Sequence, residues 1–227
     1  MGLIVIEGLD GSGKSTQINK LYEYLSSRGH KCHLLHFPRT DSPVYGELIA
    51  RFLRGDLGEI HQVDPYLVAL IYAGDRFDFK PELEKWLQED AFVLLDRYVY
   101  SNIAYQCAKI ENEKEKKILR DWILHLEFEY HGLPKPDLNI FLDVPFGFTH
   151  QKLTNARSGD ERTYLNGKRD IHEADLDFQE KVRNAYLLLS DEDAFLKISC
   201  NDNNSMLPVE QVFDKVLAGL NEKKINV

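Results

Sequence analysis

Apolar residues in this chain fall into short runs that alternate with longer stretches of helical spacing. Five of the runs are short and rich in residues that favour strands, so each is predicted to form one β-strand. They are Leu3–Glu7, Cys32–Phe37, Phe92–Asp96, Leu138–Val144 and Phe195–Ser199. The first, third and fourth runs are apolar almost throughout, which is typical of strands covered on both faces of a parallel sheet.

Between these runs, apolar residues recur every three or four positions, as on one face of a helix. Ile18, Leu21 and Leu25 form one such stripe, and Gly29 stands where that helix should end. The alternation of strand and helix predicts an α/β fold, a three-layer sandwich with a parallel five-stranded sheet. Two further helical stripes lie in the C-terminal part: Val182, Ala185, Tyr186 and Leu189, then Val209, Val212, Val216 and Leu220.

Length and composition indicate one domain. The chain has 227 residues, 43% of them hydrophobic, and no repeat or linker divides it, so residues 1–227 are treated as a single domain. The formal net charge is −9, from 28 basic and 37 acidic residues, which argues against a protein that coats nucleic acid. A few well-placed arginines and backbone amides could still bind a small anionic ligand.

The cysteines and the N-terminal residues predict a cytoplasmic protein without a membrane partner. Cys32, Cys107 and Cys200 are widely spaced and form no CxxC pair, which argues against disulfides and a zinc site and fits a reducing compartment. The apolar run Leu3–Ile6 ends at Glu7 and is too short for a signal peptide or a membrane span.

The residues GLDGSGKS, Gly8 to Ser15, match the Walker A pattern GxxxxGK(S/T) and lie between a predicted strand and a predicted helix. Glycines let the backbone turn its N–H groups toward a phosphate, and the helix adds its N-terminal dipole. Lys14 should reach the β- and γ-phosphates of ATP, and the Ser15 hydroxyl should bind Mg²⁺. The predicted nucleotide-binding residues are Gly8, Asp10, Gly11, Ser12, Gly13, Lys14, Ser15 and Thr16.

Several enzyme classes share this loop, and the rest of the chain favours a small-molecule kinase. A GTPase requires an Asn-Lys-x-Asp sequence, which is absent. A kinase instead needs a second pocket that binds an anionic group. Arg39 and Arg97 both follow predicted strands, at the sheet edge where α/β proteins bind ligands. Arginine grips phosphate with two parallel hydrogen bonds. Asp96 could support Mg²⁺ through water or hold Arg97 in place, and both roles stay open.

A polar, glycine-containing stretch, at about residues 155–170, is predicted to be a mobile lid that closes over ATP and excludes water. Its basic residues are Arg157, Arg162, Lys168 and Arg169. The acceptor of a monophosphate kinase is an anionic phosphate oxygen, so catalysis needs positioning and charge compensation rather than a general base.

The motifs together resemble those of the thymidylate kinase family, and the resemblance implies a P-loop NTPase fold. They are IEGLDGSGKSTQ (Ile6–Gln17), FPR (Phe37–Arg39), LIYAGDR (Leu70–Arg76), DRYVYSNIAYQ (Asp96–Gln106) and DIHEADLDF (Asp170–Phe178). The resemblance implies a homodimeric enzyme that phosphorylates dTMP to dTDP with Mg-ATP, in the supply of dTTP for DNA synthesis.

The resemblance also implies roles for individual acceptor-site residues. Asp10 matches the carboxylate at the 3′-hydroxyl of dTMP, and Arg39 and Arg97 match the arginines at its phosphate. Tyr72 stands where the family stacks an aromatic ring on thymine, and Tyr105 matches the ring that crowds the sugar 2′ position. Three polar residues complete the implied acceptor site: Arg76, four residues after Tyr72, and Asn102 and Gln106 on the base side.

The chain departs from some members of the family in its P-loop. Those members carry a basic residue there that assists transfer, whereas this chain has Gly11 and Ser12 in the corresponding region. Lid arginines supply the charge in such a case, and the choice among Arg157, Arg162 and Arg169 stays open. Two alternative functions also remain: a kinase for another nucleoside monophosphate or a deoxynucleoside, and a nucleotide-binding module without turnover.

Overall fold

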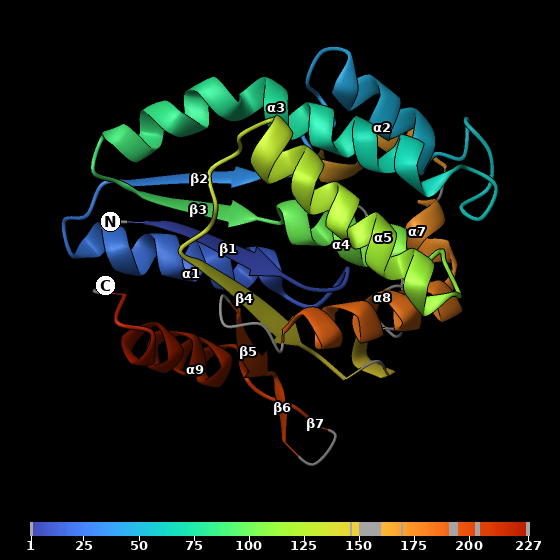
Figure 1. Cartoon of the computed structure of the whole chain (residues 1–227). Coiled ribbons are helices and arrows are strands. Elements are labelled where there is room, and N and C mark those ends of the chain that lie inside the picture. The colour runs from blue at the N-terminus through green and yellow to red at the C-terminus, as the bar shows by residue number, and fades with distance from the viewer. Residues whose placement is uncertain are drawn as a thin grey trace.

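The five predicted strands form one parallel sheet in the order β2-β3-β1-β4-β5 (Figure 1). The computed structural model describes residues 2–145, 147–149, 160–168, 170–190, 195–202 and 205–225, with side chains except at 160–162 and 174. The strands are β1 (Leu3–Glu7), β2 (Cys32–His36), β3 (Phe92–Asp96), β4 (Leu138–Asp143) and β5 (Phe195–Ser199).

Helices connect the strands and cover both faces of the sheet. Their bounds are α1 (Lys14–Ser27), α2 (Tyr45–Leu53), α3 (Pro65–Gln88), α4 (Val99–Cys107), α5 (Glu113–Leu124), α7 (Ile171–Ala174), α8 (Leu176–Leu189) and α9 (Val209–Glu222). A π-helical turn, η1 (His125–Tyr130), continues α5, and a 3₁₀ helix, η2 (Asp160–Leu165), precedes α7. Two short strands, β6 (Asn201–Asp202) and β7 (Ser205–Met206), form a small antiparallel pair. No described helix is long and apolar enough to cross a membrane.

The alternation of side chains along β1 explains the three layers. Leu3 and Val5 pack into a core with residues of α3, α4, α5 and α8, whereas Ile4 and Ile6 pack into a second core with α1 and α9. Figure 1 shows these two groups of helices on opposite faces of the sheet. The predicted α/β sandwich with a parallel five-stranded sheet is therefore confirmed.

Two predicted strands end one residue early, and a proline explains each case. The strand predicted to reach Phe37 ends at His36, and the strand predicted to reach Val144 ends at Asp143. Pro38 and Pro145 follow, and proline has no backbone N–H to continue a ladder. One predicted helical stripe also differs in the structure. Val209, its first residue, is 46% exposed, so the buried face of that helix begins at Val212.

The parallel direction of the sheet brings three predicted site segments to one edge. The P-loop follows β1, the segment with Arg39 follows β2, and Arg97 follows β3 directly. Because β1 pairs with β3, and β3 with β2, these segments leave neighbouring strands at their carboxyl ends.

Candidate active site

The P-loop turns sharply between β1 and α1 because three of its residues have positive φ angles: 152° at Gly8, 77° at Gly11 and 88° at Gly13. A Cβ atom at Gly8 would lie 2.8 Å from Oγ of Ser12, so a larger residue would not fit there. Gly13 occupies the N-cap of α1 without a side-chain cap, which leaves the N–H groups of the first turn for a phosphate.

The ammonium group of Lys14 is held against this loop by a hydrogen bond. The side chain is buried, and Nζ donates a hydrogen bond to the carbonyl oxygen of Leu9 at 2.8 Å. Burial, together with the nearby positive charge of Arg97, lowers the pKa of Lys14 to about 8. The group therefore still carries its charge at neutral pH, where it can compensate the charge of a triphosphate.

Ser15 and Asp96 meet where the P-loop faces the end of β3. The Ser15 hydroxyl donates to Oδ2 of Asp96 at 3.2 Å, and Nδ1 of His36 lies 3.3 Å from the same oxygen. Oδ1 of Asp96 is buried and has no hydrogen-bond partner within the described part of the chain. Burial raises the pKa of Asp96, but the hydrogen bond from His36 and the charge of Lys14 outweigh it and leave the pKa lowered. A hydroxyl and an ionised carboxylate thus stand side by side at the phosphate loop.

Arg97 connects the P-loop to α4. Its Nη2 donates to Oδ1 of Asp10 at 2.7 Å and to the Tyr105 hydroxyl at 3.1 Å, and Nη1 donates to Oγ of Ser101 at 3.3 Å. The Tyr105 hydroxyl in turn donates to Oδ2 of Asp10 at 2.8 Å. Burial raises the pKa of Asp10, yet Arg97 and Lys14 outweigh it and hold the pKa well below its usual range. Three of the predicted residues therefore form one hydrogen-bonded cluster.

Glu7 supports this cluster and was not among the predicted residues. Its buried carboxylate accepts hydrogen bonds from the backbone N–H groups of Tyr98 at 3.0 Å and Ser101 at 3.2 Å, from the Tyr186 hydroxyl at 2.8 Å and from the Ser101 hydroxyl. These bonds anchor the start of α4 directly after Arg97, whose φ angle is 71°. The available signal was a carboxylate at the end of a fully buried strand.

Arg39 lies at the same sheet edge but contacts α3. Nε donates to Oδ1 of Asp75 at 3.0 Å, the backbone N–H donates to Oδ2 of Asp75 at 2.9 Å, and Nη2 donates to Asp78 at 2.8 Å. Two carboxylates therefore compensate the charge of Arg39, and both were missed from sequence.

Two of the predicted acceptor-site residues contact a further carboxylate that was not predicted from sequence. Arg76 forms a two-bonded ion pair with Glu127, in which Nη2 donates to Oε1 at 2.7 Å. Asn102 also donates to Oε1 of Glu127, at 2.9 Å. Gln106 is buried on α4, and the Tyr72 hydroxyl has its pKa raised well above its usual value by burial and by the nearby charge of Asp170.

The predicted lid is described only in part. Arg157 and Arg169 lie outside the described residues, and Arg162 lies in η2 with its side chain outside the described part. Lys168 is described, and its Nζ donates to Oδ1 of Asp56 at 2.6 Å.

The segment that follows the predicted lid reaches the hydrogen-bonded cluster of Asp10, Arg97 and Tyr105. The ring of His172 lies 4.9 Å from that of Tyr105, and burial lowers the pKa of His172 to about 3. Asp170 accepts from the Tyr164 hydroxyl at 3.1 Å and from the backbone N–H of His172 at 2.8 Å. Burial and the charges of Asp10 and Glu173 raise the pKa of Asp170 to about 7. Asp170 and His172 were missed as site residues, although both stand in the DIHEADLDF motif.

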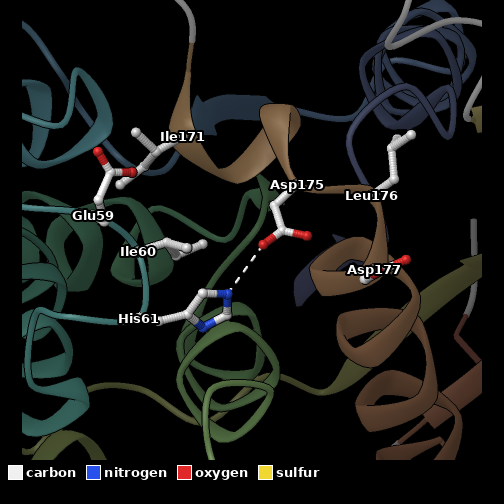
Figure 2. Close-up of a pocket in the computed structure, with 7 residues that line it drawn as sticks. All are labelled: Glu59, Ile60, His61, Ile171, Asp175, Leu176 and Asp177. Carbon is white, nitrogen blue, oxygen red and sulfur yellow. Dashed lines mark hydrogen bonds and ion pairs between the residues drawn. The ribbon is translucent and has the colours of Figure 1, made fainter.

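A separate pocket of about 470 Å³ opens between the α2–α3 connection and the start of α8 (Figure 2). Its lining contains three carboxylates and one histidine, and His61 bonds to Asp175 at 3.0 Å between Nε2 and Oδ2. None of the predicted site residues that the structure describes lines it, and its acidic character does not suit a phosphate. Its lining residues are Glu59, Ile60, His61, Ile171, Asp175, Leu176 and Asp177.

Comparisons with known proteins agree on one family. The family model described as thymidylate kinase matches residues 6–215. The thymidylate kinase of Mycobacterium tuberculosis (strain H37Rv) is 32% identical over 189 residues, 83% of this chain and 85% of that protein. The human thymidylate kinase is 32% identical over 160 residues, 67% of this chain and 69% of that protein.

The fold matches a solved structure of the same kind. The thymidylate kinase of Candida albicans superposes with a TM-score of 0.73 at 26% sequence identity, over 100% of this chain and 95% of that one. That structure is described as revealing the origin of broad substrate specificity and a novel structural element in the Candida enzyme.

Proposed function

Because this chain belongs to the thymidylate kinase family, we propose that it transfers the γ-phosphoryl group of Mg-ATP to dTMP and forms dTDP. The observation that carries the proposal is the hydrogen-bonded cluster of Asp10, Arg97 and Tyr105, in which a P-loop residue is bonded directly to two predicted acceptor residues. This contact brings a site for the donor phosphates next to a site for the acceptor.

In this proposal the P-loop binds the phosphates of ATP. The N–H groups of residues 8–16 surround the β-phosphate, and Lys14 moves from the carbonyl oxygen of Leu9 to the β- and γ-phosphates. A buried ammonium is effective there because its field is weakly screened by water.

The oxygen donors at the loop fit Mg²⁺. The Ser15 hydroxyl and the Asp96 carboxylate, which has one buried oxygen without a partner among the described residues, are hard oxygen ligands. No group of three or more His, Cys, Asp or Glu side chains in the described chain could hold a metal alone. In this proposal the Ser15 hydroxyl would bind the ion, and the Asp96 carboxylate would support it. When bound, Mg²⁺ compensates charge on the β- and γ-phosphates.

The acceptor residues orient the monophosphate for in-line attack. Arg97 and Arg39 hold the dTMP phosphate, Asp10 holds the sugar 3′-hydroxyl, and Tyr105 packs against its 2′ position. A phosphate oxygen of dTMP then forms a bond to the γ-phosphorus as the bond from that phosphorus to the β–γ bridging oxygen breaks, and ADP leaves with the electron pair. The lid arginines Arg157, Arg162 and Arg169 are proposed to compensate the charge that develops.

On the base side, Tyr72 is proposed to stack on thymine, with Arg76, Asn102 and Gln106 around the polar edge of the ring. Tyr72 and Arg76 stand four residues apart on α3, and therefore on one face of that helix. Asn102 and Gln106 are buried on α4, which packs beside α3.

We also infer a homodimer in the cytoplasm. Leu67, Leu70 and Phe77, with exposed fractions of 59%, 46% and 47%, lie on one face of α3 and offer an apolar surface to a second copy. The three cysteines are free, which suits a reducing compartment. Light scattering after size-exclusion chromatography tests the dimer, and a monomer mass at micromolar concentration would remove it.

The test of function is ADP formation from Mg-ATP with dTMP, dUMP, dCMP, dGMP, UMP, AMP and thymidine as separate acceptors. Strong selectivity for dTMP is the expected result. Preference for thymidine or AMP would keep a P-loop kinase and remove the acceptor site proposed above. No turnover with any acceptor would favour a nucleotide-binding module.

A further inference from the structure

Glu127 is a fully buried carboxylate outside every predicted motif. It lies in η1, where the chain widens from α-helical to π-helical spacing, as the bond from the N–H of His131 to the carbonyl oxygen of Leu126 shows at 2.9 Å. Glu127 is 0% exposed and Arg76, its ion-pair partner, is 2% exposed. π-Helical turns are rare and often lie at functional sites, so a functional role for this buried carboxylate is considered in addition to a packing role.

Glu127 fixes the orientation of the Asn102 side-chain amide. Nδ2 of Asn102 donates to the carbonyl oxygen of Ala69 at 3.0 Å and to Oε1 of Glu127 at 2.9 Å. Both partners only accept hydrogen bonds, so the amide nitrogen must face them, because a rotated amide would set oxygen against oxygen. Oδ1 is therefore held on the other side of the amide. It is buried and has no partner among the described residues, so it is an acceptor that requires a donor.

Glu127 also changes what Arg76 can bind. The guanidinium of Arg76 is paired with the carboxylate through two hydrogen bonds, so the pair as a whole is neutral. A neutralised, buried arginine suits a carbonyl oxygen better than a phosphate, whose negative charge would face Glu127 as well. Arg76 and Asn102 donate to the same oxygen of Glu127, so the N–H groups of Arg76 that Glu127 does not use are near Asn102 and can donate to a carbonyl oxygen of a bound base.

A nucleobase satisfies both groups if it carries an N–H donor next to a carbonyl oxygen. The imide edge of thymine or uracil has this pattern. Cytosine presents an unprotonated ring nitrogen and an amino group at the same positions, so it would set acceptor against acceptor and donor against donor. A site built to satisfy such groups rejects a mismatched base strongly, because its buried polar atoms are left unpaired.

We propose that Glu127 is a positioning residue that makes the acceptor pocket select an imide base, by holding the Asn102 amide in one orientation and neutralising Arg76. The proposal rests on the proposed function, because it assumes that the base lies at Asn102 and Arg76. It adds a residue without predicted contact to the substrate and assigns the discrimination between dTMP and dCMP to it.

Glu127→Gln is the direct test. A glutamine keeps the size of the side chain but sets its NH₂ group against a donor of Arg76 or Asn102, so the Asn102 amide loses its fixed orientation. The ratio of kcat/KM for dTMP to that for dCMP should fall at least about tenfold, mainly through the KM for dTMP. The KM for ATP should change less than about twofold. Glu129→Gln is the matched control, because Glu129 lies on the same π-turn but is exposed and pairs with Lys135 at 3.1 Å; it should leave the ratio unchanged.

A double variant keeps the proposal testable if Glu127→Gln does not fold. Arg76→Met with Glu127→Leu removes both buried charges together, a change that folded proteins often tolerate. It too should lower the dTMP-to-dCMP ratio. A folded variant that retains the ratio of the unmodified protein would overturn the role of Glu127 and leave the proposed function standing. If the unmodified protein does not use dTMP, the proposed function fails, and this inference fails with it.

Discussion

Asp10 and Arg97 stand 87 positions apart in the chain, and Nη2 of Arg97 lies 2.7 Å from Oδ1 of Asp10. The pair ties the phosphate-binding loop to the residue that follows β3, and the Tyr105 hydroxyl bonds to both partners. Each charge compensates the other in a largely buried setting. An acceptor phosphate would meet an arginine already oriented by a carboxylate, which reduces the entropy lost on binding.

Arg97→Gln should therefore weaken use of the acceptor far more than use of ATP. The variant loses the buried guanidinium that is proposed to form two hydrogen bonds to the dTMP phosphate. This loss should reduce kcat/KM for dTMP by about 10²-fold or more, with a small change in the KM for ATP. Steady-state kinetics with each substrate varied in turn measure this. Equal losses for both substrates would place Arg97 at the donor phosphates instead.

Loss of the proton from Lys14 should weaken the binding of ATP at alkaline pH. Its pKa in the free protein is lowered to about 8, chiefly by burial, so the ammonium loses its proton as the pH rises through that value. kcat/KM for ATP, which reports the free enzyme, should fall about tenfold per pH unit above this pKa. Bound phosphates favour the charged form, so the fall in kcat should begin at higher pH.

Two variants separate the role of Lys14 from other causes of that fall. Lys14→Ala should lower kcat by about 10³-fold or more while leaving the melting temperature nearly unchanged. Lys14→Arg keeps a charge that is not lost at accessible pH, so its residual activity should lack the alkaline decline. A decline that persists in Lys14→Arg would assign the titration to another group.

Sequence patterns were sufficient for the fold and for the phosphate loop, because both depend on neighbouring residues. The apolar run of β1 and the positive φ angles at glycines 8, 11 and 13 are each determined by the residues of the segment itself. The rule that ligands bind at the carboxyl ends of parallel strands then placed Arg39 and Arg97 at the correct edge.

The acidic partners of the basic residues could not be predicted in the same way. Glu7 contacts Tyr98 and Tyr186, which are 91 and 179 positions away, and Glu127 meets Arg76 across 51 positions. The buried strand β1 marked Glu7 as an unusual carboxylate, but a single sequence does not show which distant residues a carboxylate will contact. For the same reason, the interaction of Arg39 with Asp75 of α3 appeared only in the structure.

Tyr105 allows the ring and the hydroxyl to be tested separately. The ring is proposed to crowd the sugar 2′ position, whereas the hydroxyl bonds to Asp10 at 2.8 Å. Tyr105→Ala should lower the preference for dUMP over UMP by about tenfold, because the space for a 2′-hydroxyl opens. Tyr105→Phe keeps the ring, so the preference should persist within about twofold while kcat/KM falls. Loss of the preference in both variants would assign it to the hydroxyl.

Asp170 should make the stability of the protein fall as the pH rises. Burial, Asp10 and Glu173 raise its pKa from 3.8 to about 7, so the folded protein binds a proton that the unfolded chain has already released. A raised carboxyl pKa contributes stability at low pH that is lost between those two values. Asp170→Asn keeps an acceptor for the Tyr164 hydroxyl and the His172 N–H, and it removes the cost of ionisation.

The variant should therefore be more stable than the unmodified protein at about pH 9, by up to about 4 kcal/mol, and nearly equal to it at about pH 3, below both pKa values. Thermal melts of both proteins at the two pH values measure the difference. Asp177→Asn is the control, because Asp177 is an exposed carboxylate close by on α8. An equal effect of Asp170→Asn at both pH values would mean that Asp170 ionises in the folded protein as readily as in the unfolded chain, and that Asp10 and Glu173 do not repel it.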